Sequence, residues 1–148
     1  HEIESVDLMS ILAEEVEETR DSFPYADIVI EDTVPQTAVE ADGFLGSVFR
    51  NLLKNAVEHN DKERPEVTVT VERNGDHLEV RIADNGPGIT SSQKQKIFER
   101  GEKGLESEGT GIGLYLVQSL MDAYDGDMWV EDNDSEGAVF IVKFHVAI

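Results

Sequence analysis

Residues 66–89 read EVTVTVERNGDHLEVRIADNGPGI, and this stretch decides the fold. Its two runs, Glu66–Arg73 and Asp76–Ala83, alternate apolar and polar residues on either side of Asn74-Gly75, which is typical of a hairpin with a two-residue turn. Such a turn predicts three apolar pairs on one face: Val71 with Leu78, Val69 with Val80, and Val67 with Ile82. The hairpin therefore belongs to a sheet with one buried face and one polar face.

Helical patterns and shorter strands surround this hairpin. Residues 7–21 carry apolar residues at helical spacing with Asp7 as a possible cap, and a second helix is expected from Asp42 to about Asn60. The other expected elements are a strand at 26–31, a short helix at 91–100, a mobile loop at 101–110, a helix at 112–124, and strands at 128–132 and 138–146. Together they predict an α+β, two-layer sandwich, whose mixed and mostly antiparallel sheet is covered on one face by helices.

The composition of the chain narrows the function classes. Its 148 residues fit one domain, and the absence of cysteine excludes disulfides, thiolate catalysis and cysteine-ligated metals. A formal charge of −20 argues against binding to nucleic acid or to an anionic membrane. The acids could form a surface for a basic partner. Because they are spread through nearly every segment, we favour the hydrated surface of a halophilic protein.

The second predicted helix carries a polar stripe. Asn51, Asn55 and His59 are spaced by four residues, so they share one face of that helix. Side-chain amide oxygens suit Mg²⁺, which also binds substrate phosphates. Taken alone, such a stripe is more typical of a solvated polar face than of a metal site.

Two glycine-rich segments also suggest a ligand site. Asp84 follows the hairpin and precedes Gly86-Pro87-Gly88, where a carboxylate could accept a hydrogen bond from a ligand's amino group or simply form an Asx turn. Residues 109–114, GTGIGL, open a helix whose free amides could bind an anion, or they form a hinge. The second segment lacks the spacing of a Rossmann fingerprint and the Gly-Lys-Ser/Thr of a P-loop.

Four motifs in a fixed order are more specific than any one of them. They are NLLKNA (51–56), DNGPGI (84–89), KIFERG (96–101) and GTGIGL (109–114). This order resembles the N, G1, F and G2 boxes of the sensor histidine kinase catalytic domain, over about residues 6–146. That domain belongs to the superfamily of gyrase, the ninety-kilodalton heat-shock chaperone, histidine kinases and mismatch-repair ATPases. The resemblance implies the Bergerat ATP-binding fold, with ATP and Mg²⁺ as ligands.

The resemblance also implies roles for individual residues. Asn55, and more weakly Asn51, would hold Mg²⁺ against the ATP phosphates, and Asp84 would accept the adenine amino group. Lys103 would contact the phosphates from the lid and help to position them, and Arg100 is the alternative residue for this contact. The other residues implied to contact the nucleotide are His59 on the helix, Gly86, Gly88 and Ile89 at the base, Phe98 as the lid anchor, and Gly109, Thr110, Gly111, Ile112, Gly113 and Leu114 at the phosphates.

Three departures from the family pattern bear on function. Gyrase-type ATPases and serine kinases carry a glutamate base where this chain has Asn51, which favours a histidine acceptor over water or serine. Glu58 stands where many histidine kinases have a basic residue, so His59 or Lys103 would have to make that phosphate contact. Gly137, Ala138 and Val139 occupy the stretch where many relatives have a hydroxyl residue near the adenine.

The expected activity is therefore transfer of the γ-phosphoryl group to a histidine on a separate dimerisation domain. His1-Glu2-Ile3-Glu4 lacks the Arg-Thr-Pro continuation of a phosphoacceptor segment, so we interpret residues 1–5 as a linker or chain edge and 6–148 as the catalytic domain. The chain alone is expected to bind ATP without stable autophosphorylation. A response regulator would be an indirect partner, in the cytoplasm and without direct membrane contact. The alternatives are a nucleotide-gated binding module without transfer, and a serine kinase or ATPase of the same superfamily.

Overall fold

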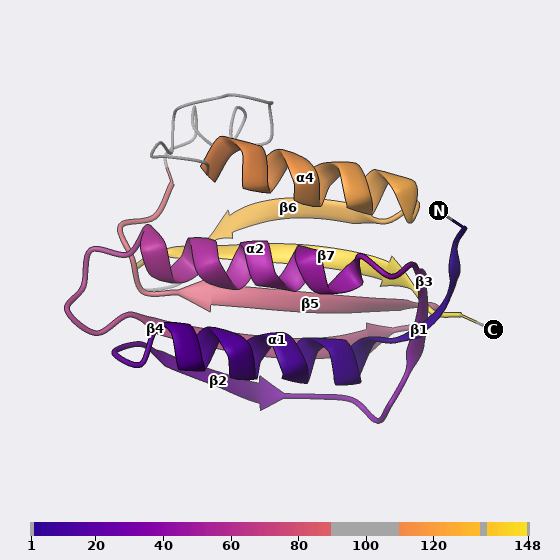
Figure 1. Cartoon of the computed structure of the whole chain (residues 1–148), viewed down its shortest axis with the longest axis horizontal. Helices are drawn as coiled ribbons and strands as arrows, with labels where there is room; N and C mark the ends of the chain where they lie inside the picture. The colour runs from indigo at the N-terminus through magenta and orange to yellow at the C-terminus, as the bar shows by residue number, and fades with distance from the viewer. Residues whose placement is uncertain (1, 90–109, 134–135, 148) are drawn as a thin grey trace.

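The computed structural model describes residues 2–89, 110–133 and 136–147 (Figure 1). Its helices are α1 (Leu8–Ser22), α2 (Leu45–Glu58) and α4 (Thr110–Ala123). Its strands are β1 (Glu4–Asp7), β2 (Asp27–Asp32), β3 (Ala38–Ala41), β4 (Glu66–Asn74), β5 (His77–Asp84), β6 (Asp127–Asp132) and β7 (Ala138–His145). The predicted helix at 91–100 and nearly all of the loop predicted at 101–110 lie outside these residues.

The main sheet has five strands in the order β2-β4-β5-β7-β6. Strands β2 and β4 pair in parallel, whereas the other three pairs are antiparallel. A separate two-stranded sheet joins β1 to β3. The prediction of a mixed, mostly antiparallel sheet is confirmed.

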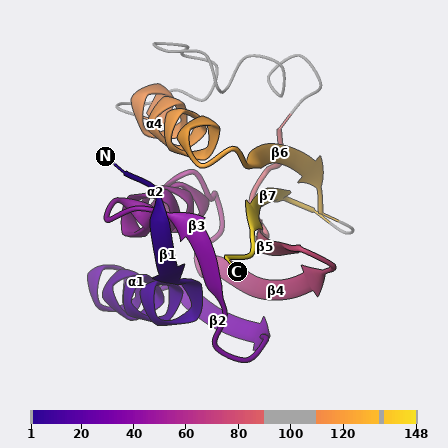
Figure 2. The same ribbon diagram turned by 90° about the vertical axis from the view of Figure 1, so that its right-hand side faces the viewer.

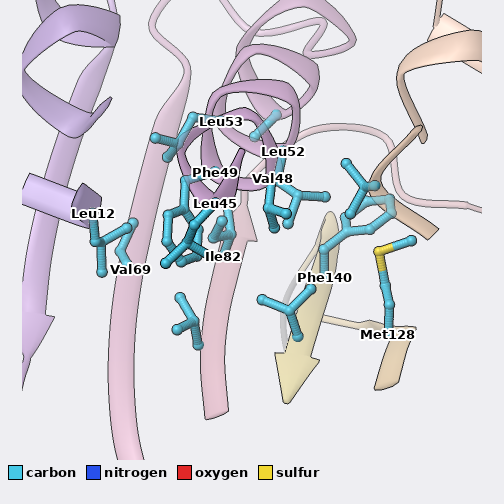
Figure 3. Close-up of a cluster of buried hydrophobic side chains, with 14 of the residues drawn as sticks. Leu12, Leu45, Val48, Phe49, Leu52, Leu53, Val69, Ile82, Met128 and Phe140 are labelled. Carbon is cyan, nitrogen blue, oxygen red and sulfur yellow. The ribbon is translucent and has the colours of Figure 1, made fainter. Parts of the chain in front are cut away.

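The helices cover a single face of the main sheet, as Figure 2 shows in side view. On that face, Val67, Val69, Leu78, Val80 and Ile82 are almost completely buried, as the hairpin pattern predicted. Helix α2 lies in the middle of the layer and points its apolar side chains at the strands (Figure 3). The buried side chains of α2 are Leu45, Val48, Phe49, Leu52, Leu53, Ala56 and Val57. The apolar stripe therefore faces the sheet, which leaves polar residues for the remaining faces of the helix.

The predicted register of the hairpin is wrong by two residues. Val71 pairs with Val80 and Val69 with Ile82, because the central turn residues are Gly75 and Asp76. Gly75 has a φ of +63°, and Asp76 is not among the residues with positive φ. That combination is the sign pattern of a type II′ turn with glycine first, in contrast to the type I′ turn that Asn-Gly suggests. A shift of two residues keeps every side chain on its predicted face.

Strands β1 and β3 were not predicted, because four-residue strands carry little periodic pattern.

The predicted cap of α1 is partly correct. Asp7 is the N-cap residue but makes no capping hydrogen bond, and it accepts the Ser10 hydroxyl at 2.8 Å instead. Asp42 does not open α2, which begins at Leu45. Its carboxylate, which is buried, accepts the Phe44 N–H at 2.9 Å and the Tyr124 hydroxyl.

Several helices and strands begin or end at the same end of the sandwich. Helix α2 and strand β5 both finish there, and α4 begins there, on the side away from the two termini (Figure 1). These are the segments that carry the predicted site residues. Among the described helices, none is long and apolar enough to span a membrane.

Candidate functional site

The asparagines of α2 supply the first part of the candidate site. Asn51 and Asn55 are both half-buried, one helical turn apart. The Asn51 side chain donates its Nδ2 to the Ser47 carbonyl at 2.7 Å, which fixes the orientation of the amide. The Asn55 Oδ1 is buried, and no described residue forms a hydrogen bond with it. A buried acceptor without a donor is costly, so this oxygen is suited to an incoming cation or donor.

The C-terminal end of α2 is linked directly to the loop after β5. His59 is the C-cap residue, and its N–H donates to the Asn55 carbonyl at 3.1 Å. The next residue, Asn60, donates its Nδ2 to the Asn85 Oδ1 at 2.7 Å. The same Asn85 oxygen accepts the Glu66 N–H at 2.9 Å. These bonds place the helix stripe and Asp84 at one end of the molecule.

The Asp84 carboxylate is the second part of the site. It ends β5 and is 9% exposed. Its Oδ1 accepts two backbone N–H groups, from Gly86 at 2.9 Å and from Ala138 at 3.3 Å. No donor among the described residues binds Oδ2. One oxygen is thus held by the protein, and the other can accept a hydrogen bond from a ligand.

The environment of Asp84 shifts the pKa of its carboxyl group. Burial raises the pKa of this carboxyl above its usual value, because the charged form loses solvation. The N–H groups of Gly86 and Ala138 and the charge of Lys62 oppose that rise in pKa. Buried carboxylates with shifted pKa values gather at functional sites, which supports the assignment of Asp84 to a binding pocket.

The glycines after Asp84 allow close approach of the backbone. A Cβ on Gly86 would lie 3.2 Å from the Asp84 Oδ1, and Gly88 has a φ of +83°, which L side chains rarely adopt. Ile89 packs partly buried against the hydrophobic core. The three residues therefore lie in the loop that leads directly from Asp84, as predicted.

The start of α4 is the third part of the site. Thr110 is the first residue of this helix, so Gly111, Ile112 and Gly113 lie in its first turn. Leu114 is buried in the core and anchors the helix to it. The predicted lid residues Phe98, Arg100, Lys103 and Gly109 lie outside the described part of the chain.

Several residues at this end were not predicted from the sequence. Asn133 donates its Nδ2 to the Asp84 carbonyl at 2.8 Å. Lys62 forms ion pairs with Glu136 at 2.8 Å and with Asp61 at 3.2 Å. Each contact joins residues distant in sequence or on irregular loops, so no periodic pattern reveals it. Asn85, which contacts Asn60 and Glu66, is the exception, because it belongs to the DNGPGI motif that is visible in the sequence.

Comparison with known proteins identifies the family. Residues 41–148 match the family described as histidine kinase-, DNA gyrase B-, and HSP90-like ATPase. The chain belongs to this ATPase family. The adaptive-response sensory kinase SasA of Gloeothece citriformis is 30% identical over 139 residues, which are 90% of this chain and 35% of that protein. The chain spans about a third or less of the length of the curated relatives it matches.

Solved structures share the fold of this ATPase domain across almost its full length. The catalytic domain of histidine kinase ThkA, in a nucleotide-free form, is 26% identical with a TM-score of 0.86 and covers 98% of each chain. ShkA, solved at full length in complex with AMPPNP, is 26% identical with a TM-score of 0.80, over 98% of this chain and 32% of its own. The predicted sensor histidine kinase ATP-binding domain and its fold are confirmed.

Proposed function

We propose that this domain binds ATP with Mg²⁺ and transfers the γ-phosphoryl group to a histidine on a separate dimerisation domain. The observation that carries the proposal is the Asp84 carboxylate, which is buried with Oδ1 held by two backbone N–H groups. Its Oδ2 can accept one hydrogen of the adenine amino group. Gly86 and Gly88 carry no Cβ, so the backbone after Asp84 could approach the purine closely.

The amide oxygens of α2 fit a magnesium ion held jointly by protein and phosphates. The buried Asn55 Oδ1 has no donor within residues 2–89, 110–133 and 136–147, and neutral oxygen is a ligand type that Mg²⁺ accepts. Among the described residues, no group of three or more carboxylates, histidines or cysteines could bind a metal ion on its own. The ion would therefore have to be shared with the ATP phosphates. Asn55, with Asn51 as a second ligand, would hold the ion, which when bound neutralises phosphate charge.

The remaining implied contacts complete the proposed binding site. We assign Ile89 to the adenine pocket, and the first turn of α4, Thr110–Gly113, to the phosphates, because backbone N–H groups at a helix start favour anions. Phe98, Arg100, Lys103 and Gly109 remain expectations from the sequence. Lys103 or His59 would make the phosphate contact for which Glu58 has the wrong charge.

The residue types in α2 favour transfer over hydrolysis. A general base must accept a proton from the attacking group, and an asparagine amide cannot do so. Asn51 also uses its Nδ2 to bind the Ser47 carbonyl. An imidazole nucleophile needs less activation than water or a serine hydroxyl, so catalysis would come from positioning and charge neutralisation.

The proposal includes partners and a location. The phosphoacceptor histidine would lie on a dimerisation domain, and a response regulator receiver domain would take the phosphoryl group from that histidine. Residues 6–148 would form the catalytic unit in the cytoplasm, where ATP is available. Residues 1–5 would lead into it, and Glu4 and Ser5 already lie in β1.

The test is incubation of the domain with [γ-³²P]ATP and Mg²⁺, with and without the histidine-bearing segment of its parent protein. The expected result is acid-labile label on the acceptor only, with no stable label on this chain and little phosphate release without the acceptor. Rapid phosphate release without the acceptor would favour the ATPase alternative. Nucleotide binding without any transfer would favour a gated binding module.

A further inference from the structure

We propose that Asn133 and Gly137, in the turn between β6 and β7, position Asp84 and thereby set the preference of the site for a 6-amino purine over a 6-oxo purine. This inference rests on the proposed function, because it takes Asp84 as the group that binds the base. Both are positioning residues, since they act through Asp84.

Asn133 holds the backbone of Asp84. Its side-chain Nδ2 donates to the Asp84 carbonyl at 2.8 Å, and its own N–H donates to the Gly137 carbonyl at 3.1 Å. The first bond joins residues 49 positions apart. One residue therefore closes its own turn and fixes the end of β5 to it.

Gly137 allows that turn to lie directly against Asp84. Its φ of +98° suits glycine, and an added Cβ would lie 2.0 Å from the Asp84 carbonyl oxygen and 2.8 Å from its Oδ1. These distances are far below contact, and the first is to backbone, so any side chain at 137 must displace β5 or the turn. The same close approach brings the Ala138 N–H within 3.3 Å of Oδ1.

The two contacts together fix the direction in which Asp84 presents Oδ2. The carbonyl is held by Asn133, and Oδ1 is held by Gly86 and Ala138. The ion pair between Lys62 and Glu136, at 2.8 Å, ties the same turn to the segment after α2. A 6-amino group donates a hydrogen bond to a carboxylate, whereas a 6-oxo group repels it, so the direction of Oδ2 decides between the two bases.

The test compares ADP with inosine diphosphate, which has the same charge but a 6-oxo base. Affinities are measured by isothermal titration calorimetry with Mg²⁺ for the wild-type chain, Asn133→Ala and the isosteric Asn133→Asp. We expect the wild type to prefer ADP. In both variants ADP affinity should fall by about 5- to 30-fold, and inosine diphosphate affinity by less than about 3-fold. Because both ligands are diphosphates, the charge added in Asn133→Asp cancels in the ratio.

Controls separate positioning from general stability. Gln118→Ala removes a comparable amide bond, which donates to Asp122 at 3.0 Å on α4, and should leave both affinities unchanged. Gly137→Ala should lose ADP preference at least as strongly as Asn133→Ala. A wild-type ratio in both folded Asn133 variants overturns this inference alone. Failure of the wild-type chain to bind ADP overturns the proposed function, and the inference with it.

Discussion

Replacement of Asp84 by asparagine is the perturbation whose effect can be worked out most fully. The side-chain carbonyl oxygen of the new amide can still accept the N–H groups of Gly86 and Ala138, which Oδ1 accepts at 2.9 and 3.3 Å. The amide nitrogen then replaces Oδ2 and presents hydrogens to the adenine amino group, which is itself a donor. The loss of one charge-assisted hydrogen bond is worth about 1.5–3 kcal/mol, or about 10- to 150-fold in ATP affinity.

The assay for Asp84→Asn is calorimetric titration with ADP and Mg²⁺ across pH. Burial raises the Asp84 pKa in the folded chain above the usual value for aspartate, so wild-type affinity should fall as pH drops through that raised pKa. The variant should lack this fall. A raised folded pKa also means that protonation favours the folded state, so this residue's contribution to stability improves as pH falls through that pKa. Unchanged ADP affinity in the folded variant would refute the assignment of Asp84 to the base.

Three further predictions concern the ion, the core and the surface. Asn55→Ala removes a buried oxygen that has no partner in the described part of the chain, so the unfolding free energy should change by less than about 1 kcal/mol. The Mg²⁺-dependent gain in ATP affinity should be lost. An unchanged Mg²⁺ dependence in titrations would contradict the assignment. Tyr124→Phe removes the hydroxyl that donates to the buried Asp42 carboxylate. Urea denaturation should show an unfolding free energy lower by about 1–3 kcal/mol, while the affinity for ADP stays unchanged. An unchanged urea midpoint would disprove this. The net charge of −20 predicts that the thermal midpoint rises with KCl up to about 2 M, and a midpoint independent of salt would count against a halophilic surface.

The sequence predicted the features that depend on local pattern. The helix expected between Asp42 and Asn60 and the buried face of the hairpin follow from periods of 3.6 and 2 residues, and the structure contains both. The position of Asp84 follows from its place between a strand and a glycine-rich turn. The order of the four motifs then identified the family, which no single motif could do.

The features that escaped prediction depend on contacts between distant residues. The Tyr124 bond to Asp42 spans 82 positions and the Asn133 bond to Asp84 spans 49, and neither leaves a periodic trace. The hairpin register depended on whether Gly75 is the first or the second residue of the turn, which the dipeptide alone does not decide. Strands β1 and β3 are short and gain their order from pairing with each other.

The most direct test of the central claim is a crystal structure of the domain with a non-hydrolysable ATP analogue and Mg²⁺. The account predicts the 6-amino group of the base at hydrogen-bond distance from the Asp84 Oδ2, with the ion bound to the Asn55 Oδ1 and to phosphate oxygens. A base bound away from Asp84, or an ion without Asn55 as a ligand, would contradict it.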